Sequence, residues 1–221
     1  MKKNLFRPSL NKAYSSIRIS KKPLLIIAAF FFIHPLAAFP AEGPCGDAYV
    51  TGEIADARNL IPFLATDTAS SGITSLVFNG LTKVDRDLNI IGDIAEKWDI
   101  SGDGKVITFF LKKGIKWHDG VPLTGRDVKF TIEAILDPKN ACPYSSEFMD
   151  IKSIEVMDDY TVKFTYSKPY APAISKLGMS IVPEHLLKGR DLVKSDFRRN
   201  PVGCGPYIFK EWKTDQYIVL D

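Results

Sequence analysis

The sequence predicts an α/β fold, and three stretches between residues 98 and 166 carry this prediction. The first is a pair of apolar segments around Ser101-Gly102-Asp103-Gly104, which is typical of a hairpin because glycine reaches the positive φ of a tight turn. The second follows Thr124, where apolar residues recur at helical spacing. In the third, from Tyr160 to Tyr166, apolar and polar residues alternate as in a half-buried strand.

The first 41 residues have the composition of an export signal. They contain seven Lys or Arg and no acid, and Leu24 to Ile33 forms an apolar run too short to span a bilayer comfortably. Small residues follow the run, and cleavage after Ala38 or Ala41 fits them, although neither site is ideal. We therefore expect residues 1–41 to be a signal peptide. An uncleaved membrane anchor is the alternative interpretation.

The positive charge of the chain belongs to this leader. The whole chain has 29 basic and 26 acidic residues and a net charge of +3; without the seven basic residues of the leader, 22 basic residues remain and the net charge is −4. A mildly acidic chain with no cluster of Lys or Arg gives no electrostatic reason to expect nucleic-acid binding.

The cysteines and histidines do not form a metal-binding pattern. Cys45, Cys142 and Cys204 allow one internal disulfide at most, and the sequence does not decide the pair. No C-x-x-C is present, and His118 and His185 are too far apart for a ligand motif, so we expect no metal site. Asp119 has no nucleophile or partner acid beside it in the sequence, so we interpret it as a turn residue rather than a general base.

Along the chain, the first elements are predicted from residues 49 to 80. Tyr49 to Ile54 is predicted as a strand, Ala55 to Ser71 as a polar loop interrupted by Pro62, and Ile73 to Val77 as part of a short amphipathic helix.

The middle of the chain contains the strongest local signals. Val106 to Leu111 is apolar at nearly every position, which predicts a strand buried on both faces. Ile115 to Trp117 is predicted as a further short strand. Thr124 and Asp127 have the spacing of a capping box, so the helix is predicted to begin there, and Pro138 ends it. Another hairpin is predicted from Ile154 to Tyr166.

The same region closely resembles the signature of family 5 extracellular solute-binding proteins, the peptide, dipeptide and nickel receptors of ABC importers. The resemblance is carried from Trp98 to Phe130 by the run W-x-I-S-x-D-G-K-x-x-T-F-x-L-K-x-G-I-K-W-H-D-G-x-P-L-T-x-x-D-V-K-F. A match of this length, with the turns and the cap in register, is far more specific than a short motif. It extends in weaker form over nearly all of residues 48–221.

The resemblance implies a fold and a domain plan. It implies a periplasmic-binding-protein-like α/β fold of type II, of which this chain contains part of lobe I and the small inserted mixed α/β domain. The second ligand-binding lobe of the family has no counterpart in the sequence. The implied ranges are 42–80 for the first part of lobe I, 81–199 for the inserted domain and 200–221 for the return strand of lobe I.

The resemblance also implies the residues of a peptide site. The loop after Pro62, which contacts ligand backbone in peptide receptors, matches Thr66, Asp67 and Thr68. The loop from Asp137 to Ser146 resembles the family sequence whose tyrosine reaches the ligand, and that position is Tyr144. The simpler alternatives are an ordinary polar surface loop and a tyrosine that packs onto its own domain.

The resemblance therefore implies a periplasmic substrate-binding component of an ABC importer that captures peptides and delivers them to the membrane permease. It implies no enzymatic activity and no cofactor. Two alternatives remain open: a nickel or metallophore receptor of the same family, and an exported structural or chaperone-like module.

We predict that the exported protein begins between Phe39 and Glu42. The basic segment and the apolar run direct export, and the small residues after the run are the cleavage region. Amino-terminal sequencing of periplasmic material checks this, and recovery of Met1 would contradict it.

Overall fold

The computed structural model describes residues 48–221. The predicted signal peptide and Cys45 lie outside this range. Within it, no helix has the length and apolar character needed to cross a membrane.

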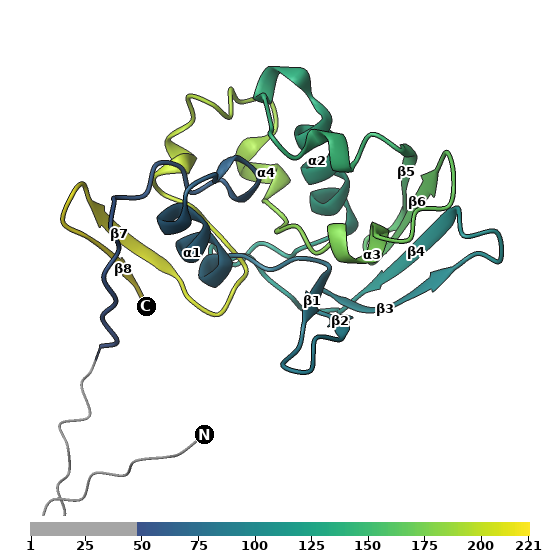
Figure 1. The fold of residues 1–221 in the computed structure, drawn as a ribbon, viewed down its shortest axis with the longest axis horizontal. Coiled ribbons are helices and arrows are strands. Elements are labelled where there is room, and N and C mark those ends of the chain that lie inside the picture. Colours follow the sequence, from purple (N-terminus) through teal and green to yellow (C-terminus); the bar gives the residue numbers. More distant parts are fainter. Residues whose placement is uncertain (1–47) are drawn as a thin grey trace, which may run out of the picture. The chain divides into compact units, whose positions relative to one another are not determined.

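The main sheet has four strands that are all antiparallel to their neighbours (Figure 1). Two hairpins supply the strands, and β4 pairs with β6 so that Phe109 lies opposite Val162. The order across the sheet is β3 (Ala95–Ile100), β4 (Val106–Leu111), β6 (Thr161–Tyr166) and β5 (Ile151–Asp158).

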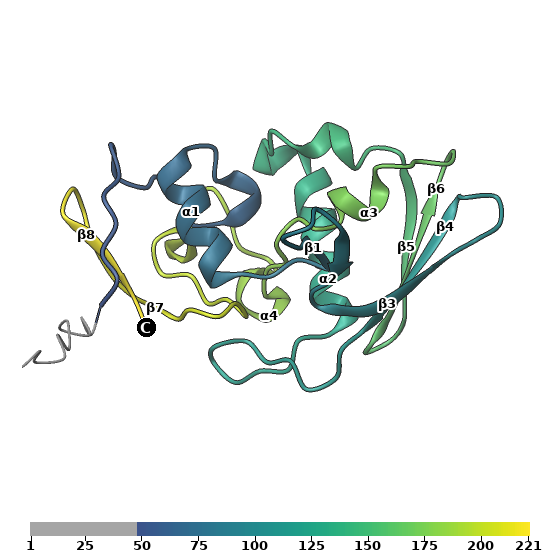
Figure 2. The same cartoon turned by 60° about the horizontal axis from the view of Figure 1, so that its bottom comes forward.

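Helix α2 (Gly125–Leu136) covers one face of this sheet (Figure 2). On that face Phe109 and Phe164 are fully buried, and their rings meet edge to face with centroids 5.9 Å apart. The alternate residues of β4 and β6 are only partly buried. The prediction that Val106–Leu111 is buried on both faces is therefore wrong. Within residues 48–221 one layer covers the sheet, and on its other face Lys97 Nζ lies 4.8 Å from the centre of the Phe110 ring.

The predicted turn between β3 and β4 is confirmed. Gly104 has a φ of +68°, which glycine adopts without strain. The Ser101 hydroxyl donates to Asp103 Oδ1 at 2.6 Å and accepts from the N–H of Val106 at 2.9 Å. Local side chains therefore satisfy the backbone where the chain reverses.

The capping box of α2 is also confirmed. The hydroxyl of Thr124 accepts from the N–H of Arg126 at 3.3 Å, and Asp127 Oδ2 accepts from the N–H of Thr124 at 2.8 Å. The helix ends at Leu136, and Pro138 opens the short 3-10 helix η2 (Pro138–Asn140).

Asp127 also connects α2 to a distant segment. Its other oxygen, Oδ1, accepts from the N–H of Glu184 at 2.9 Å, the first residue of α4 (Glu184–Leu187). One turn further, the hydroxyl of Thr131 accepts from the N–H of Val182 at 3.0 Å. Burial raises the pKa of the Asp127 carboxyl even though backbone N–H groups donate to it. The helix cap is thus also a tertiary contact.

Two predicted strands are absent. Tyr49 to Ile54 has no regular structure, and Tyr49 and Ile54 are fully exposed, because no strand within residues 48–221 pairs with this segment. Ile115 to Trp117 forms only a single bridge, between Lys116 and Pro122, because the chain turns back at Gly120 before a ladder develops.

Helix α1 (Thr68–Val77) begins earlier than the apolar residues from Ile73 to Val77 indicate, because Asp67 caps it. The remaining elements are short: η1 (Pro62–Leu64), β1 (Thr82–Val84), β2 (Ile90–Gly92), η3 (Ser145–Glu147), α3 (Ala173–Lys176), η4 (Asp196–Arg198), β7 (Phe209–Lys213) and β8 (Tyr217–Leu220). The strands β1 with β2 and β7 with β8 form two separate antiparallel hairpins.

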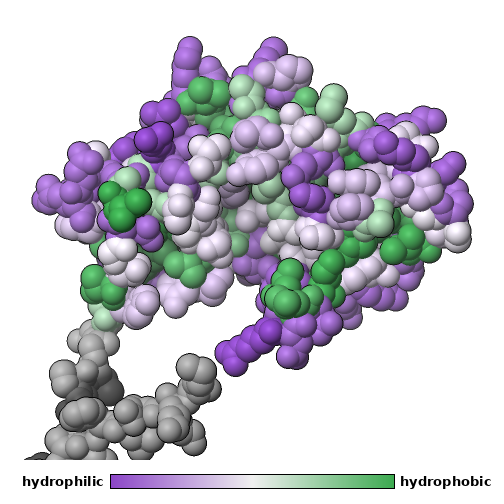
Figure 3. Space-filling model, in the orientation of Figure 1, coloured by the Kyte–Doolittle hydropathy of each residue, from purple (hydrophilic) through white to green (hydrophobic). Residues whose placement is uncertain are grey.

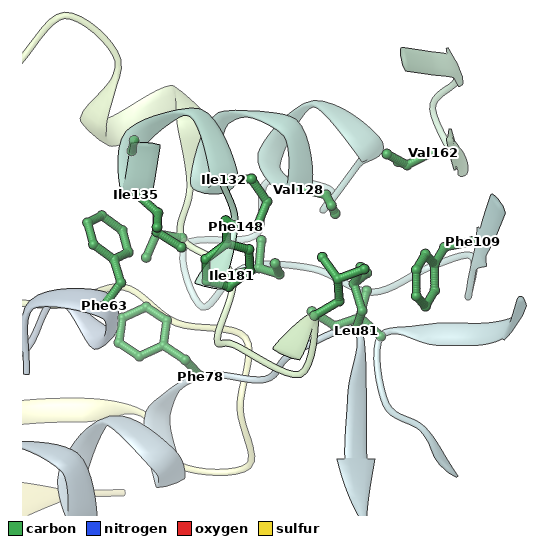
Figure 4. Packing of buried hydrophobic residues seen from close by; sticks show 14 of the residues in the cluster. Phe63, Phe78, Leu81, Phe109, Val128, Ile132, Ile135, Phe148, Val162 and Ile181 are labelled. Carbon is green, nitrogen blue, oxygen red and sulfur yellow. The ribbon is translucent and has the colours of Figure 1, made fainter. Parts of the chain in front are cut away.

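One apolar cluster joins these elements (Figure 4). Phe63 from η1 and Phe78 from the end of α1 belong to the same buried cluster as Ile132 and Ile135 of α2. The helices and the sheet therefore share a single main core.

The segment from Gly203 to Gly205 lies against the end of α1. The N–H of Gly205 donates to the carbonyl oxygen of Val77 at 2.8 Å, and a Cβ at Gly203 would overlap that same carbonyl oxygen. Glycine at position 203 is thus required by the close approach of two backbones.

We predict that Thr124→Ala lowers the free energy of unfolding by about 1 kcal/mol, because it removes the acceptor at the start of α2. Asp127→Ala should lower it by about 3 kcal/mol, since two backbone N–H groups lose a charged acceptor in a buried site.

Denaturant unfolding checks both values. Glu133→Ala, an exposed change on the same helix, is the matched control and should stay within about 0.5 kcal/mol of the parent. Losses of equal size at positions 124, 127 and 133 would contradict the assigned cap.

Candidate ligand-binding surface

The loop Ala65–Thr68 contains three of the four predicted site residues. It leaves η1, whose Phe63 is fully buried, and its last residue, Thr68, is the first residue of α1. Thr66 and Thr68 are exposed, and Asp67 is partly buried. Because Phe63 is buried before this segment and α1 begins at its end, only these few residues face solvent.

The side chain of Asp67 is used within the loop. Its Oδ1 accepts from the N–H of Ser70 at 2.8 Å, and its Oδ2 accepts from the hydroxyl of Ser70 at 2.7 Å. The carboxylate therefore caps α1, and the threonine hydroxyls are the freely exposed side-chain groups beside it.

The loop that follows α2 packs against the same place. The thiol of Cys142 donates to the carbonyl oxygen of Phe63 at 3.1 Å, and the hydroxyl of Tyr144 lies 3.4 Å from the carbonyl oxygen of Ala65. Ala141 adopts a left-handed φ of +47° to make this turn. Two segments that are 79 residues apart in the sequence thus meet at the Ala65 carbonyl.

The structure therefore places Tyr144 beside the segment that carries Thr66, Asp67 and Thr68. Sequence reasoning missed the three groups that hold this candidate surface, which are the Cys142 thiol, the Ser70 hydroxyl and the Ala65 carbonyl. A small polar residue or a cysteine in a loop has no local pattern that indicates such a contact.

Cys142 and Cys204 are not bonded to each other. Burial raises the pKa of the Cys142 thiol, and it raises the pKa of the Cys204 thiol to about 12. Thiols that remain protonated are weak nucleophiles and weak metal ligands. Cys142 instead contributes to packing and to one hydrogen bond.

The histidines that we expect not to bind a metal are His118 and His185. His118 contacts backbone groups, and His185 contacts an acidic side chain. His118 accepts from the N–H of Gly203 through Nδ1 at 3.3 Å, and its Nε2 lies 3.0 Å from the carbonyl oxygen of Gly205. His185 Nε2 lies 2.7 Å from Asp119 Oδ2. Within residues 48–221 no group of three or more potential ligands is placed to hold a metal ion.

A cavity lies away from the predicted site. It has a volume of about 730 Å³ between α1, the β1–β2 hairpin and Gly205. An ion pair between Lys83 and Asp93, with 3.0 Å between the charged atoms, lies at its wall. Apolar residues of the β1–β2 hairpin are exposed beside it, as Figure 3 shows at the lower edge of the view.

A family model identifies the chain. Bacterial extracellular solute-binding proteins, family 5, match residues 89–221, which is more than half of the sequence. The chain belongs to this family.

Individual members are similar over most of the chain. The oligopeptide-binding protein AppA of Bacillus subtilis is 35% identical over 193 residues, which are 84% of this chain and 35% of AppA. The probable D,D-dipeptide-binding periplasmic protein DdpA of Escherichia coli is 34% identical over 218 residues, covering 91% of this chain and 40% of DdpA.

Solved structures agree on the fold. The crystal structure of NikZ from Campylobacter jejuni in complex with Ni(L-His) has a TM-score of 0.71 and 40% identity, and covers 78% of this chain and 34% of NikZ. AppA in complex with a nonapeptide has a TM-score of 0.72 and 34% identity, covering 77% of this chain and 35% of AppA. The type II peptide-receptor fold expected from the sequence is confirmed, and the chain spans about a third of the length of these proteins.

We predict that the contact between Asp119 and His185 contributes to stability near neutral pH and is lost in acid. Burial works to raise the pKa of Asp119, but donation by His185 and by the N–H of Val121 outweighs it and holds the pKa below the ordinary 3.8. A lowered pKa in the folded state gives a contribution that is present above the unfolded-state pKa and disappears as pH falls through the folded one.

Urea unfolding of Asp119→Asn between pH 7 and pH 3 checks this. The variant should be less stable than the parent at pH 7 by up to about 1 kcal/mol, and this difference should shrink as the pH falls below 3.8. Asp159→Asn, at an exposed turn, is the control. A difference that stays constant down to pH 3 would contradict the assignment.

Proposed function

We propose that this chain supplies one side of a peptide-binding site in the periplasmic substrate-binding component of an ABC importer. Its contacts to the ligand are Thr66, Asp67, Thr68 and Tyr144. The chain acts by binding and has no catalytic role. AppA and DdpA, whose names describe peptide receptors, support the ligand class.

The observation that carries the proposal is the meeting of the two loops at the Ala65 carbonyl. The hydroxyl of Tyr144 lies 3.4 Å from that oxygen, immediately beside exposed Thr66. Two segments singled out separately in the sequence thus lie beside each other. Tyr144 also packs against the main core, as the simpler alternative of a tyrosine packed onto its own domain expects, so the support for a ligand role is its position beside exposed Thr66.

The chemistry of the surface suits a peptide main chain. Hydroxyl groups donate and accept, so the two threonines and Tyr144 match alternating N–H and C=O groups of an extended peptide. The ring of Tyr144 adds apolar contact area at the same place. Because Asp67 already accepts twice from Ser70, its carboxylate offers only its remaining lone pairs to a ligand.

The domain plan follows the family. Residues 1–41 direct export to the periplasm, residues 42–80 and 200–221 belong to lobe I, and residues 81–199 form the inserted domain. A second lobe closes over the ligand in this mechanism by a hinge motion, and the loaded protein then delivers the peptide to the membrane permease.

A nickel complex is the second candidate ligand, because NikZ in complex with Ni(L-His) is 40% identical over the region it shares with this chain. The described part of this chain offers hydroxyls and one carboxylate at the candidate surface rather than imidazoles or thiolates. These are weak ligands for bare nickel, which prefers nitrogen donors, so a nickel ion would have to arrive with its own nitrogen ligands, as in Ni(L-His). We therefore favour peptide.

We predict that the chain binds short peptides only weakly, with a dissociation constant in the range of about 1 mM. Half of a two-lobed site gains only part of the contact area, while association still costs several kcal/mol of lost motional freedom. Titration of the isotope-labelled chain with the peptide Ser-Thr-Ser-Ala, followed by nuclear magnetic resonance, should shift the signals of Thr66 to Thr68 and of Tyr144.

Tyr144→Ala should abolish these shifts. Tyr207→Ala, at another half-exposed tyrosine, is the matched control and should leave them unchanged. Shifts produced by Ni(II) with L-histidine and not by peptide would favour the nickel receptor. No response to either ligand would favour a structural module, and submicromolar binding of peptide by the monomer would contradict the half-site argument.

A further inference from the structure

Ser70 stands out among the polar residues of the chain because it is fully buried and its hydrogen-bonding capacity is completely used. Its hydroxyl donates to Asp67 Oδ2 at 2.7 Å, and it accepts from the N–H of Arg58 at 2.8 Å and from the N–H of Asn59 at 3.2 Å. A serine hydroxyl has one proton and two lone pairs, so no capacity remains.

These contacts exceed what the start of a helix requires. The cap of α1 needs only the N–H of Ser70, which Asp67 Oδ1 accepts at 2.8 Å, and an alanine at position 70 would keep that bond. The hydroxyl instead reaches Arg58 and Asn59, which precede η1 and lie outside the helix. The Ser70 hydroxyl therefore makes a tertiary contact and is not part of the helix cap.

The effect of these bonds is to close a loop. Arg58 and Ser70 are 12 residues apart, and the hydroxyl of Ser70 joins them at the base of the segment that contains η1 and the loop Ala65–Thr68. Within this segment, the carbonyl oxygens of Phe63 and Ala65 contact Cys142 and Tyr144. The segment is thus held at its ends by Ser70 and in its middle by the loop after α2.

We infer that Ser70 is the positioning residue of the candidate ligand-binding surface. By fixing both ends of the closed loop, it holds Thr66, Asp67 and Thr68 in one arrangement relative to Tyr144 before a ligand arrives. A loop that is already ordered loses less conformational freedom on binding, so the same few contacts give a higher affinity. This inference rests on the proposed peptide site for its functional meaning, and on the contacts of Ser70 for its structural content.

Hydrogen–deuterium exchange of the full chain without ligand tests the positioning role. Ser70→Ala should speed exchange of the amides from Arg58 to Thr68 by about tenfold or more, because the acceptor of the Arg58 and Asn59 amides is lost and the loop is no longer closed. Amides of β4 and β6 should exchange as in the parent. Ser75→Ala is the matched control, since Ser75 lies on the same helix but its hydroxyl donates only to Gly72 O, at 2.7 Å.

Faster exchange confined to residues 58–68 in Ser70→Ala, and absent in Ser75→Ala, supports the inference. Unchanged exchange in that segment, or an equal increase throughout β4 and β6, would overturn it. If Ser70→Ala does not fold, Asp67→Asn decides: it keeps an oxygen that caps the N–H of Ser70 but replaces Oδ2, the acceptor of the Ser70 hydroxyl proton, with an amide NH2, and it should speed exchange of the Arg58 and Asn59 amides.

The peptide titration is a separate measurement. Failure of the parent chain to respond to peptide counts against the proposed function and leaves the exchange result standing. If the parent responds, Ser70→Ala should weaken peptide binding about tenfold and Ser75→Ala should not. A Ser70→Ala variant with faster loop exchange and unchanged peptide affinity would overturn the claim that positioning matters for binding.

Discussion

The apolar face of the four-stranded sheet must be covered, and α2 is the element that covers it. Phe109 and Phe164 are fully buried on that face, and both belong to the cluster that reaches Ile132 and Ile135. The position of α2 depends on Asp127, which caps the helix and also accepts from the N–H of Glu184. The loop after α2 is then directed toward η1, where the candidate surface forms. One buried carboxylate thus links the packing of the sheet to the geometry of the site.

The parts of the fold that were correctly predicted from sequence are those specified locally. The turn around Gly104 and the cap at Thr124 depend on residues within a few positions of each other, so their side chains carry enough information. The predictions for Val106–Leu111, Tyr49–Ile54 and Ile115–Trp117 needed knowledge of partners. Whether a strand is covered on one face or two, or has a neighbour at all, is decided by distant segments that a local pattern does not contain.

The residues of the candidate site were predicted by resemblance to a family and not from local sequence patterns. Thr66, Asp67, Thr68 and Tyr144 were selected through resemblance to a family, because their residue types alone indicate only polar loops. Their proximity depends on contacts of Cys142 and Tyr144 with carbonyl oxygens 79 residues away. A carbonyl oxygen is present in every residue, so the sequence contains no mark of which one will be used. The supporting role of Ser70 was missed because its tertiary partners are backbone N–H groups, which almost every residue also carries.

The close packing of Gly203 and Gly205 against the end of α1 has a consequence for how this chain tolerates change. Both flanking positions lie where an added Cβ would meet the backbone of Leu76 and Val77, whereas Cys204 between them lines the large cavity. Substitution in this tripeptide is therefore confined to its middle residue. A different side chain at position 204 would alter the cavity wall while the path of the backbone is preserved, so exchanges at this position offer a way to vary the cavity surface without rebuilding the fold.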